Sequence, residues 1–192
     1  MRITGGTALN RRLKTPGTGR TENVRPTSDR VREALFSILG KSVQDSRVLD
    51  LFAGTGALGI EALSRGASSA VFVDHHPRSI DLIRTNILTC LNHADVTILR
   101  LDLSRKSSYY ALTKRLKDRK PFDLIFLDPP YEKKLAEKAL TMVEKAELLS
   151  ENGLVIVEEN ADVNLPEKIG SLVVRQKRTY GKTGIWLYSA EV

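Results

Sequence analysis

Short apolar runs alternate with amphipathic stretches along most of the chain, beginning at Arg47. Apolar runs of this length between polar turns are typical of buried parallel strands, and apolar residues at 3.6 spacing are typical of helices. The predicted strands are Val48–Leu51, Ala70–Val73, Val96–Leu99, Phe122–Leu127 and Gly153–Val157. The predicted helices between and after them are Ala57–Ser64, Pro77–Leu91, Tyr109–Lys117 and Leu135–Leu148. This alternation predicts an α/β fold with right-handed crossovers and a mostly parallel sheet.

The two ends of the chain depart from this alternation. Leu172–Arg178 and Ile185–Ser189 read as strands with no helix between them, which predicts an antiparallel C-terminal hairpin. At the front, Arg2–Thr4 and Arg12–Lys14 predict a short hairpin, and Pro26–Asp29 opens a helix that Gly40 ends. We therefore expect a basic N-terminal extension over residues 1–25 and one α/β domain over residues 26–192.

Composition and charge narrow the class of protein. The chain has 192 residues, of which 41% are hydrophobic and 28% charged, as in an ordinary globular domain. It has no apolar run near membrane-spanning length and no signal segment, so we expect a cytoplasmic protein with no membrane partner. One cysteine and three histidines without ligand spacing predict no metal site.

The net charge of +7 is concentrated at the N-terminus. Residues 1–32 hold eight basic and two acidic residues, a local charge of +6. Such asymmetry suggests a polyanionic partner, RNA or DNA, although a solvated basic arm would look the same.

A glycine loop follows the first predicted strand. It contains Gly54-x-Gly56-x-x-Gly59, and Asp74 lies twenty residues beyond Gly54, which matches the dinucleotide-binding fingerprint. However, Asp50 ends the strand beside this loop, where its carboxylate would repel a pyrophosphate. S-adenosylmethionine has no phosphate and carries a sulfonium and an amino group, so Asp50 favours this cofactor over NAD. A tight turn without any ligand is the alternative.

Three acids fall at the ends of three successive predicted strands: Asp50, Asp74 and Asp102. Asp74 is placed to accept the ribose hydroxyls of a nucleoside cofactor, and Asp102, with the backbone of Leu103, to accept from an adenine amino group. His75 or the histidine after it could lie along the adenine, but an exposed or capping histidine is the favoured interpretation. Asp102 alone could equally be a helix cap.

Asp128-Pro129-Pro130-Tyr131 ends the strand Phe122–Leu127. Two consecutive prolines cannot continue a ladder and predict a stiff corner at the carboxyl end of a strand, where open α/β sheets bind ligands. Asp128 and the Pro129 carbonyl could accept both N–H bonds of an exocyclic amine and direct its lone pair at a methyl group. Tyr131 could stack on the base. The alternative is a purely structural turn.

The order of these motifs resembles the Rossmann-like class I S-adenosylmethionine-dependent methyltransferases that modify amino groups. More narrowly, the chain resembles the bacterial RsmD family. The resemblance lies in Ile3–Gly6 with Arg12, in Arg25–Phe36, in Leu51–Gly66 and in the proline corner. The resemblance covers nearly the whole chain. Ala8–Arg11, where the family more often has a glycine between basic residues, departs from it, and so does Asp74-His75, where a glutamate is common.

The resemblance implies a seven-stranded sheet with an antiparallel last strand. It also implies methyl transfer to the N2 of one guanine in 16S ribosomal RNA, either free or within the small subunit or its assembly intermediate. A monomer is the default state. The residues it assigns to the cofactor, besides the acids and His75 above, are Phe52, Ala53, Gly54, Thr55, Gly56, Arg25 and Thr27. Those it assigns to RNA are Arg11, Arg12, Lys14 and Arg30.

Three other functions compete with this interpretation. A DNA adenine-N6 methyltransferase would use the same proline corner, but it usually needs an added recognition domain that this chain lacks. A NAD-dependent oxidoreductase would need an acid/base for hydride transfer, which the sequence does not offer. A non-catalytic RNA-binding module would need no proline corner.

Overall fold

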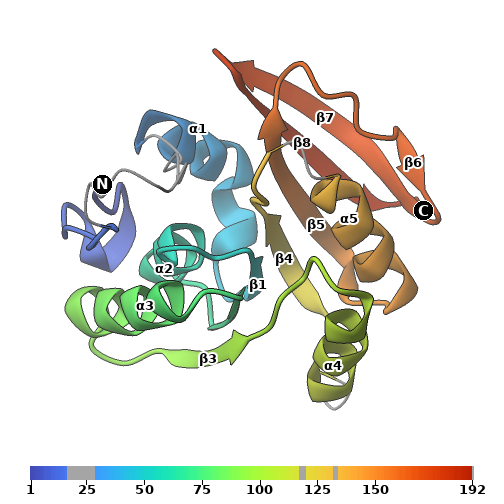
Figure 1. Cartoon of the computed structure of the whole chain (residues 1–192). Helices are drawn as coiled ribbons and strands as arrows, with labels where there is room; N and C mark the ends of the chain where they lie inside the picture. The colour runs from blue at the N-terminus through green and yellow to red at the C-terminus, as the bar shows by residue number, and fades with distance from the viewer. Residues whose placement is uncertain (17–28, 117–119, 132–133, 192) are drawn as a thin grey trace. The chain divides into compact units, whose positions relative to one another are not determined.

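The computed structural model describes residues 1–16, 29–116, 120–131 and 134–191 (Figure 1). The chain divides into two compact units, Met1–Arg100 and Leu101–Val192, and each is described by itself. The start of the helix expected at Pro26–Asp29 lies outside the described residues.

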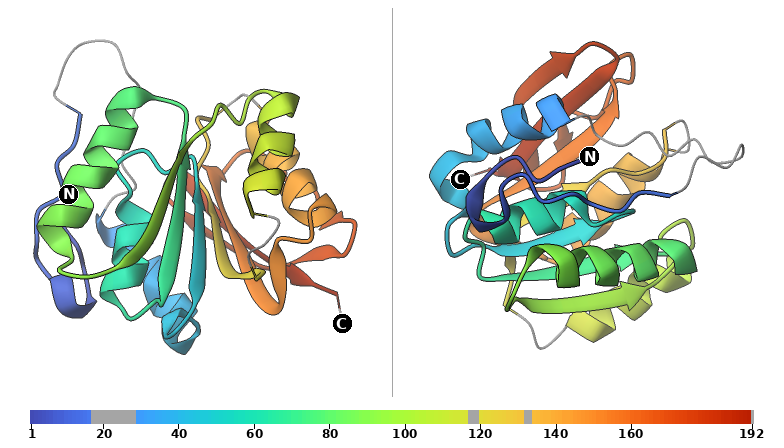
Figure 2. Two further views of the ribbon diagram at one scale, coloured as in Figure 1. Left: turned by 90° about the horizontal axis from the view of Figure 1, so that it is seen from below. Right: turned by 90° about the vertical axis from the view of Figure 1, so that its left-hand side faces the viewer.

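The first unit is built on three parallel strands. These are β1 (Arg47–Leu51), β2 (Ser69–Asp74) and β3 (Asp95–Arg100), with β2 in the middle. Between them run α2 (Ala57–Ser64) and α3 (Pro77–Cys90), which pack side by side and cover one face of these strands (Figures 1 and 2). The strands and helices predicted from the apolar pattern are therefore present here in the predicted order.

The second unit begins with α4 (Lys106–Leu116), β4 (Phe122–Leu127), α5 (Leu135–Lys145) and β5 (Leu149–Asn160). It continues with β6 (Lys168–Ile169), β7 (Leu172–Tyr180) and β8 (Thr183–Ala190). β4 and β5 are parallel, whereas β8 is antiparallel to both β5 and β7, so the predicted C-terminal hairpin is confirmed.

Two predicted details of this unit are wrong. Counted over both units, the described residues form eight strands rather than seven, because the two-residue β6 of this unit adds a short antiparallel edge to β7. In addition, α5 ends at Lys145 and β5 starts at Leu149, four residues before the predicted Gly153. Leu149 pairs with Phe122 of β4, a contact between strands that the local apolar pattern does not reveal.

The N-terminal segment, residues 1–16, folds back on itself and docks on the first unit. Arg2 and Arg12 form an antiparallel bridge around the short 3-10 helix η1 (Gly6–Ala8), in line with the predicted hairpin. Ile3, Ala8 and Leu13 are buried, so this basic segment is anchored by apolar side chains.

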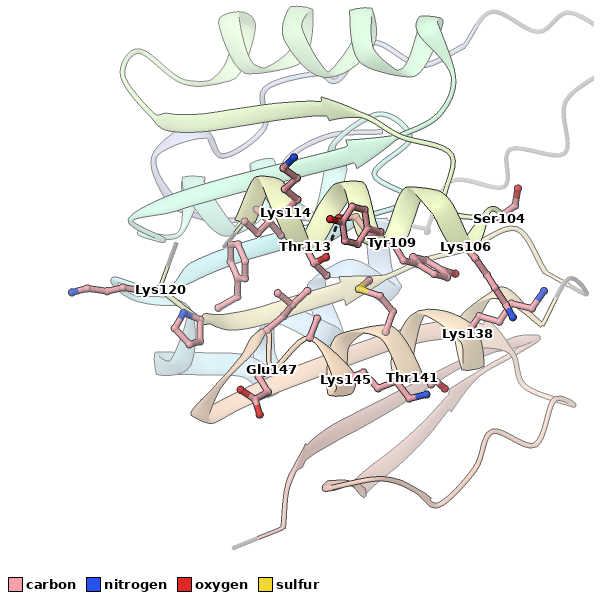
Figure 3. Close-up of a pocket in the computed structure, with 17 residues that line it drawn as sticks. Ser104, Lys106, Tyr109, Thr113, Lys114, Lys120, Lys138, Thr141, Lys145 and Glu147 are labelled. Atoms are coloured by element: carbon pink, nitrogen blue, oxygen red, sulfur yellow. Dashed lines mark hydrogen bonds between the residues drawn. The ribbon is translucent and has the colours of Figure 1, made fainter. Parts of the chain in front are cut away.

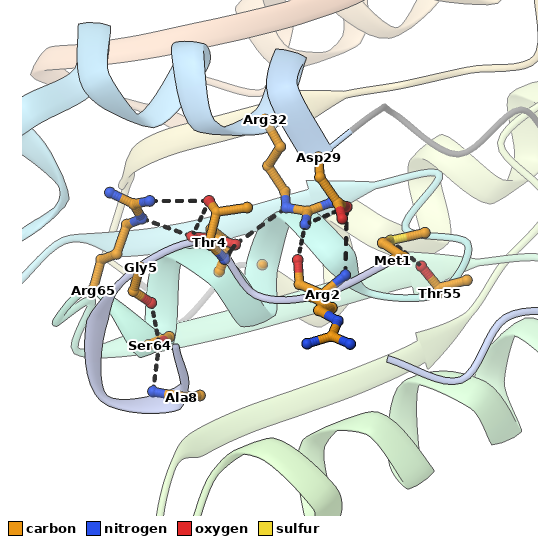
Figure 4. A network of polar contacts seen from close by, with 12 residues as sticks. Met1, Arg2, Thr4, Gly5, Ala8, Asp29, Arg32, Thr55, Ser64 and Arg65 are labelled. Atoms are coloured by element: carbon orange, nitrogen blue, oxygen red, sulfur yellow. Dashed lines mark hydrogen bonds and ion pairs between the residues drawn. The ribbon is translucent and has the colours of Figure 1, made fainter. Parts of the chain in front are cut away.

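A buried ionic network ties this segment to α2 and to α1 (Asp29–Leu39), the helix that precedes β1 (Figure 4). The Glu61 carboxylate is fully buried and accepts from the Thr4 N–H at 2.8 Å. It also pairs with Arg32 at 3.1 Å and with Arg65 at 2.8 Å. Arg32 is fully buried as well and forms a second ion pair with Asp29 at 3.0 Å. Glu61 on α2 therefore connects the N-terminal segment, through Thr4, with α1, through Arg32.

Replacing Glu61 with glutamine should destabilise the protein strongly. The variant keeps the shape of the side chain but removes the only fully buried ionic partner of Arg32 among the described residues and leaves the half-exposed Asp29, which costs about 3–5 kcal/mol. Chemical denaturation in urea measures the free energy of unfolding directly. The control is Asp81→Asn, which breaks an exposed pair with Arg84 and should cost about 0–1 kcal/mol. Equal losses for the two variants would contradict this role of Glu61.

Candidate active site

The glycine loop between β1 and α2 has an unusual backbone. Gly54 and Gly56 have positive φ angles of 56° and 77°, which glycine adopts without steric cost. Phe52 also has a positive φ of 64°, a conformation that is costly for a bulky side chain and is often found at functional sites. Backbone hydrogen bonds from Ala53 to Val73 (3.0 Å) and from Gly56 to Ala53 (2.7 Å) hold the turn.

The last two glycines of the motif allow close packing. A Cβ on Gly56 would lie 3.2 Å from Ile60 and 3.3 Å from Ile83, and one on Gly59 would overlap the Phe72 ring. Helix α2 can therefore approach β2 only with glycine at position 59. This spacing brings the start of α2 to the end of β1, the position at which Rossmann-like folds bind a nucleoside cofactor.

Asp74, at the end of β2, braces the glycine loop. Its Oδ2 accepts from the Gly54 N–H and its Oδ1 from the His76 N–H, both at 2.8 Å. His76 in turn caps α3, because its Nδ1 accepts from the Arg78 N–H. His75 is mainly exposed and lies 3.5 Å from the Asp74 carboxylate. The prediction of a helix-capping histidine therefore applies to His76. Asp74, at the end of its strand, holds the glycine loop by a hydrogen bond.

Asp50, at the end of β1, lies beneath the loop. Its side chain is 1% exposed, and Oδ2 accepts from the Gly59 N–H at 2.9 Å. Burial raises the pKa of this carboxyl to about 7; the Gly59 hydrogen bond opposes the shift, and the nearby charge of Asp74 adds to it. Near neutral pH Asp50 is therefore close to the midpoint of its titration, where a bound cation would favour the ionised form.

Asn86 on α3 is a positioning residue that the sequence prediction missed. It is fully buried and donates to the backbone carbonyls of Thr55 (2.9 Å) and Lys14 (3.0 Å), and it accepts from the Lys14 N–H (2.7 Å). The glycine loop and the N-terminal segment therefore share one side chain. The available signal was a polar residue three positions after Ile83, on the face of α3 that is buried.

Asp102 and Leu103 lie in the second unit, before α4. Asp102 Oδ1 accepts from the Ser104 N–H at 3.1 Å and from its hydroxyl at 2.6 Å, and Oδ2 pairs with Arg105 at 2.9 Å. The side chain is 35% exposed, whereas Leu103 is buried. The turn-capping alternative therefore describes the observed contacts of Asp102, and its carboxylate remains partly accessible to solvent.

The proline corner follows β4 directly. Asp128 is half-buried, Pro129 is buried, Pro130 is exposed and Tyr131 is half-buried. The Tyr131 hydroxyl donates to Glu158 Oε1 at 3.4 Å, and Glu158 is itself 5% exposed. This contact fixes the direction of the Tyr131 ring at the end of the strand.

Glu158 is a second residue that the sequence prediction missed. Leu127 and Val157 form the last pair of the parallel β4–β5 ladder, so Asp128 and Glu158 each come directly after this pair. The sequence shows an acid directly after the apolar run of β5. Only the pairing register of β4 and β5 shows that this acid lies beside the proline corner. The carboxylate of Glu158 is thus placed at the proline corner by sheet pairing.

The candidate RNA-binding residues on described parts of the chain are exposed. They are Arg11, Arg12, Lys14 and Arg30. Arg11 donates to the Thr89 carbonyl at 2.7 Å, which holds its guanidinium beside α3. Arg25 and Thr27 lie outside the described residues.

The described residues contain neither a candidate metal site nor a candidate membrane-spanning helix. No group of three or more metal-ligating side chains could hold a metal ion there. Similarly, none of the helices in the described ranges is long and apolar enough to cross a membrane.

Comparison with known proteins identifies the family. The family model described as "Conserved hypothetical protein 95" matches residues 1–189. Ribosomal RNA small subunit methyltransferase D of Escherichia coli (strain K12) is 30% identical over 191 residues, covering 100% of this chain and 90% of the relative. The chain belongs to the RsmD family.

One more relative and one solved structure also match nearly the whole of this chain. YlbH of Bacillus subtilis (strain 168) is 39% identical over 189 residues, 98% of both proteins. The solved structure of yhhF from Escherichia coli covers 100% of this chain and 98% of its own, with a TM-score of 0.81 and 30% identity. The fold is the Rossmann-like α/β fold of the S-adenosylmethionine-dependent methyltransferases, as predicted.

The raised pKa of Asp50 predicts a pH dependence of stability. Between pH 3.8 and about pH 7 the folded protein keeps a proton that the unfolded chain releases. The contribution of Asp50 to the free energy of unfolding is therefore full below pH 3.8 and is lost as the pH rises toward 7, by up to about 1.4 kcal/mol per pH unit. Urea denaturation of the wild type and of Asp50→Asn across this range measures it.

The difference between the two proteins isolates Asp50 from all other titrating groups. Relative to the wild type, Asp50→Asn should gain stability as the pH rises, because the amide cannot become charged. Parallel curves for the two proteins over the whole range would show that Asp50 titrates normally and would contradict its burial as the cause.

Proposed function

We propose that this protein transfers a methyl group from S-adenosylmethionine to the exocyclic N2 amino group of a guanine in 16S, small-subunit ribosomal RNA. The observation that carries this proposal is the corner Asp128-Pro129-Pro130-Tyr131 at the end of β4, whose tyrosine is oriented by the buried Glu158. Membership of the RsmD family supports it, as does the name of the Escherichia coli relative.

The residues around the glycine loop fit S-adenosylmethionine better than a dinucleotide. Asp50 and Asp74 both bond to backbone N–H groups of the loop and its helix, so negative charge lies where a pyrophosphate would have to bind. S-adenosylmethionine supplies a methyl group on a positively charged sulfur, together with an amino group. In this proposal Asp50 contributes a negative potential to the positive end of the cofactor, and Asp74 accepts its ribose hydroxyls.

The rest of the cofactor-binding assignment is also a proposal. The backbone of Phe52, Ala53, Gly54, Thr55 and Gly56 borders the cofactor. Asp102 and the Leu103 backbone accept from the adenine, and His75 lies along its edge. Arg25 and Thr27 contribute near the methionine end.

The proline corner handles the amine. The lone pair of an exocyclic amino group is delocalised into the base, which makes the group a poor nucleophile. The Asp128 carboxylate and the Pro129 carbonyl accept the two N–H bonds and hold the nitrogen with its lone pair directed at the methyl carbon. As the N–C bond forms and the C–S bond breaks, the amine loses one proton, which Asp128 accepts.

Tyr131 and the basic N-terminal segment act on the RNA. The Tyr131 ring, held through its hydroxyl by Glu158, stacks on the guanine once the base is unstacked. Arg11, Arg12, Lys14 and Arg30 are exposed and can contact phosphates. The names of the relatives refer to ribosomal RNA, which favours RNA over the DNA adenine alternative.

Replacing Asp128 with alanine should strongly slow methyl transfer. Loss of one preorganised acceptor at the reacting amine is expected to lower kcat by about 100-fold to 1,000-fold. The assay is transfer of a labelled methyl group from S-adenosylmethionine to small-subunit ribosomal RNA, with duplex DNA as the competing substrate. The expected product is N2-methylguanosine in the RNA and no label in the DNA.

Two controls accompany this assay. Asp123→Ala removes another half-buried carboxylate of the same strand, one that bonds to Ser150, and should leave transfer near the wild-type rate. Both variants should keep the thermal stabilisation that S-adenosylhomocysteine gives and NADH does not. Wild-type transfer rates in Asp128→Ala, or label on adenine in DNA, would refute the proposal.

A further inference from the structure

An open groove lies between α4 and α5 in the second unit, and none of the residues that line it is assigned above to the cofactor or the amine (Figure 3). Its volume is about 1110 Å³, large enough for several nucleotides or a short peptide. Leu116, Phe122, Met142 and Leu148 supply an apolar floor, and all four are buried.

Helix α5 turns its positive side chains toward this groove. Lys138, Thr141 and Lys145 line the groove at positions i, i+3 and i+7, which form one face of a helix. The acids of α5 do not line it: Glu144 instead bonds to the Ser171 N–H on the side of the C-terminal strands. The two kinds of charge are therefore separated on α5.

Helix α4 faces the groove with a matching stripe. Lys106, Tyr109, Tyr110, Thr113 and Lys114 fall at i, i+3, i+4, i+7 and i+8, and all of them line the groove. With Lys120, the described residues that line the groove include five lysines and a single acid, Glu147. In Figure 3 Lys106 and Lys138 extend from the two helices toward the same end of the groove.

The two tyrosines give the groove a second chemistry. The Tyr110 side chain is 73% exposed, an unusual exposure for an aromatic ring in a globular protein. The Tyr109 hydroxyl is buried and has no hydrogen-bond partner among the described residues. Burial and the charge of Asp102 raise the pKa of this hydroxyl, so it remains a proton donor at neutral pH.

We propose that this groove binds a single-stranded segment of RNA, as a contact additional to the proline corner. The lysines contact phosphates and Tyr110 stacks on a base. A positive groove with aromatic platforms is the arrangement that single-stranded nucleic acids require. An acidic peptide would use the lysines but would leave the exposed Tyr110 ring without a flat partner. The inference rests on the proposed function only in taking RNA as the substrate class.

The test is equilibrium binding of a fluorescein-labelled oligouridylate of about 12 nucleotides, followed by fluorescence anisotropy over a salt series. The groove variant is Lys138→Gln/Lys145→Gln, and the matched control is Lys41→Gln/Lys182→Gln, which removes two exposed lysines outside the groove. Loss of two phosphate contacts should lower the salt slope by about 1.4 and the affinity at 0.1 M salt by about 20-fold. The control should bind like the wild type.

Tyr110→Ala tests the stacking contact and should weaken binding by about tenfold. All of these substitutions are on the surface, and unchanged thermal unfolding shows that each variant is folded. Equal binding by the groove variant and its control, or unchanged binding by Tyr110→Ala, overturns the proposal. So does wild-type protein that binds anionic lipid vesicles but not the oligonucleotide.

Binding is measured without cofactor, so the two proposals can fail separately. Weakened oligonucleotide binding by the groove variant supports the groove even where Asp128→Ala leaves methyl transfer unchanged. Conversely, wild-type binding by the groove variant overturns the groove and leaves the proposed methyl transfer intact.

Discussion

Two buried carboxylates at neighbouring strand ends hold the backbone of the glycine loop, and the rest of the first unit depends on them. Asp74 accepts a hydrogen bond from the N–H of Gly54 in the loop, and Asp50 accepts one from the N–H of Gly59 in α2. The loop and the helix after it are therefore each held by one carboxylate. Hydrogen bonds to a charged acceptor are stronger than neutral ones. They help to offset the backbone strain at Phe52, which has a positive φ.

The N-terminal segment shares the supports of this loop. Asn86 bonds to the backbone of both Thr55 and Lys14, and Glu61 on α2 bonds to Thr4 near the other end of the segment. The segment and the loop therefore depend on the same buried polar groups, whose hydrogen-bond partners lie in both. The proposed RNA-binding and cofactor-binding surfaces of the first unit are built on one network.

Sequence reasoning found the elements whose signals are local. The apolar runs located the strands, and the motif Gly54-x-Gly56-x-x-Gly59 located the loop. It misplaced the start of β5 and overlooked β6, because both depend on pairing with strands distant in sequence. The roles of Asn86 and Glu158 were missed for the same reason: a buried amide or carboxylate acquires its partner only from the packing of other elements.

The central claim is that the proline corner directs a methyl group to one guanine amine. Mass mapping of methylated nucleosides in 16S ribosomal RNA, from cells with and without the gene, tests it most directly. The account predicts that one N2-methylguanosine disappears on deletion and returns with the wild-type gene but not with Asp128→Ala. An unchanged set of methylated guanines after deletion would contradict it.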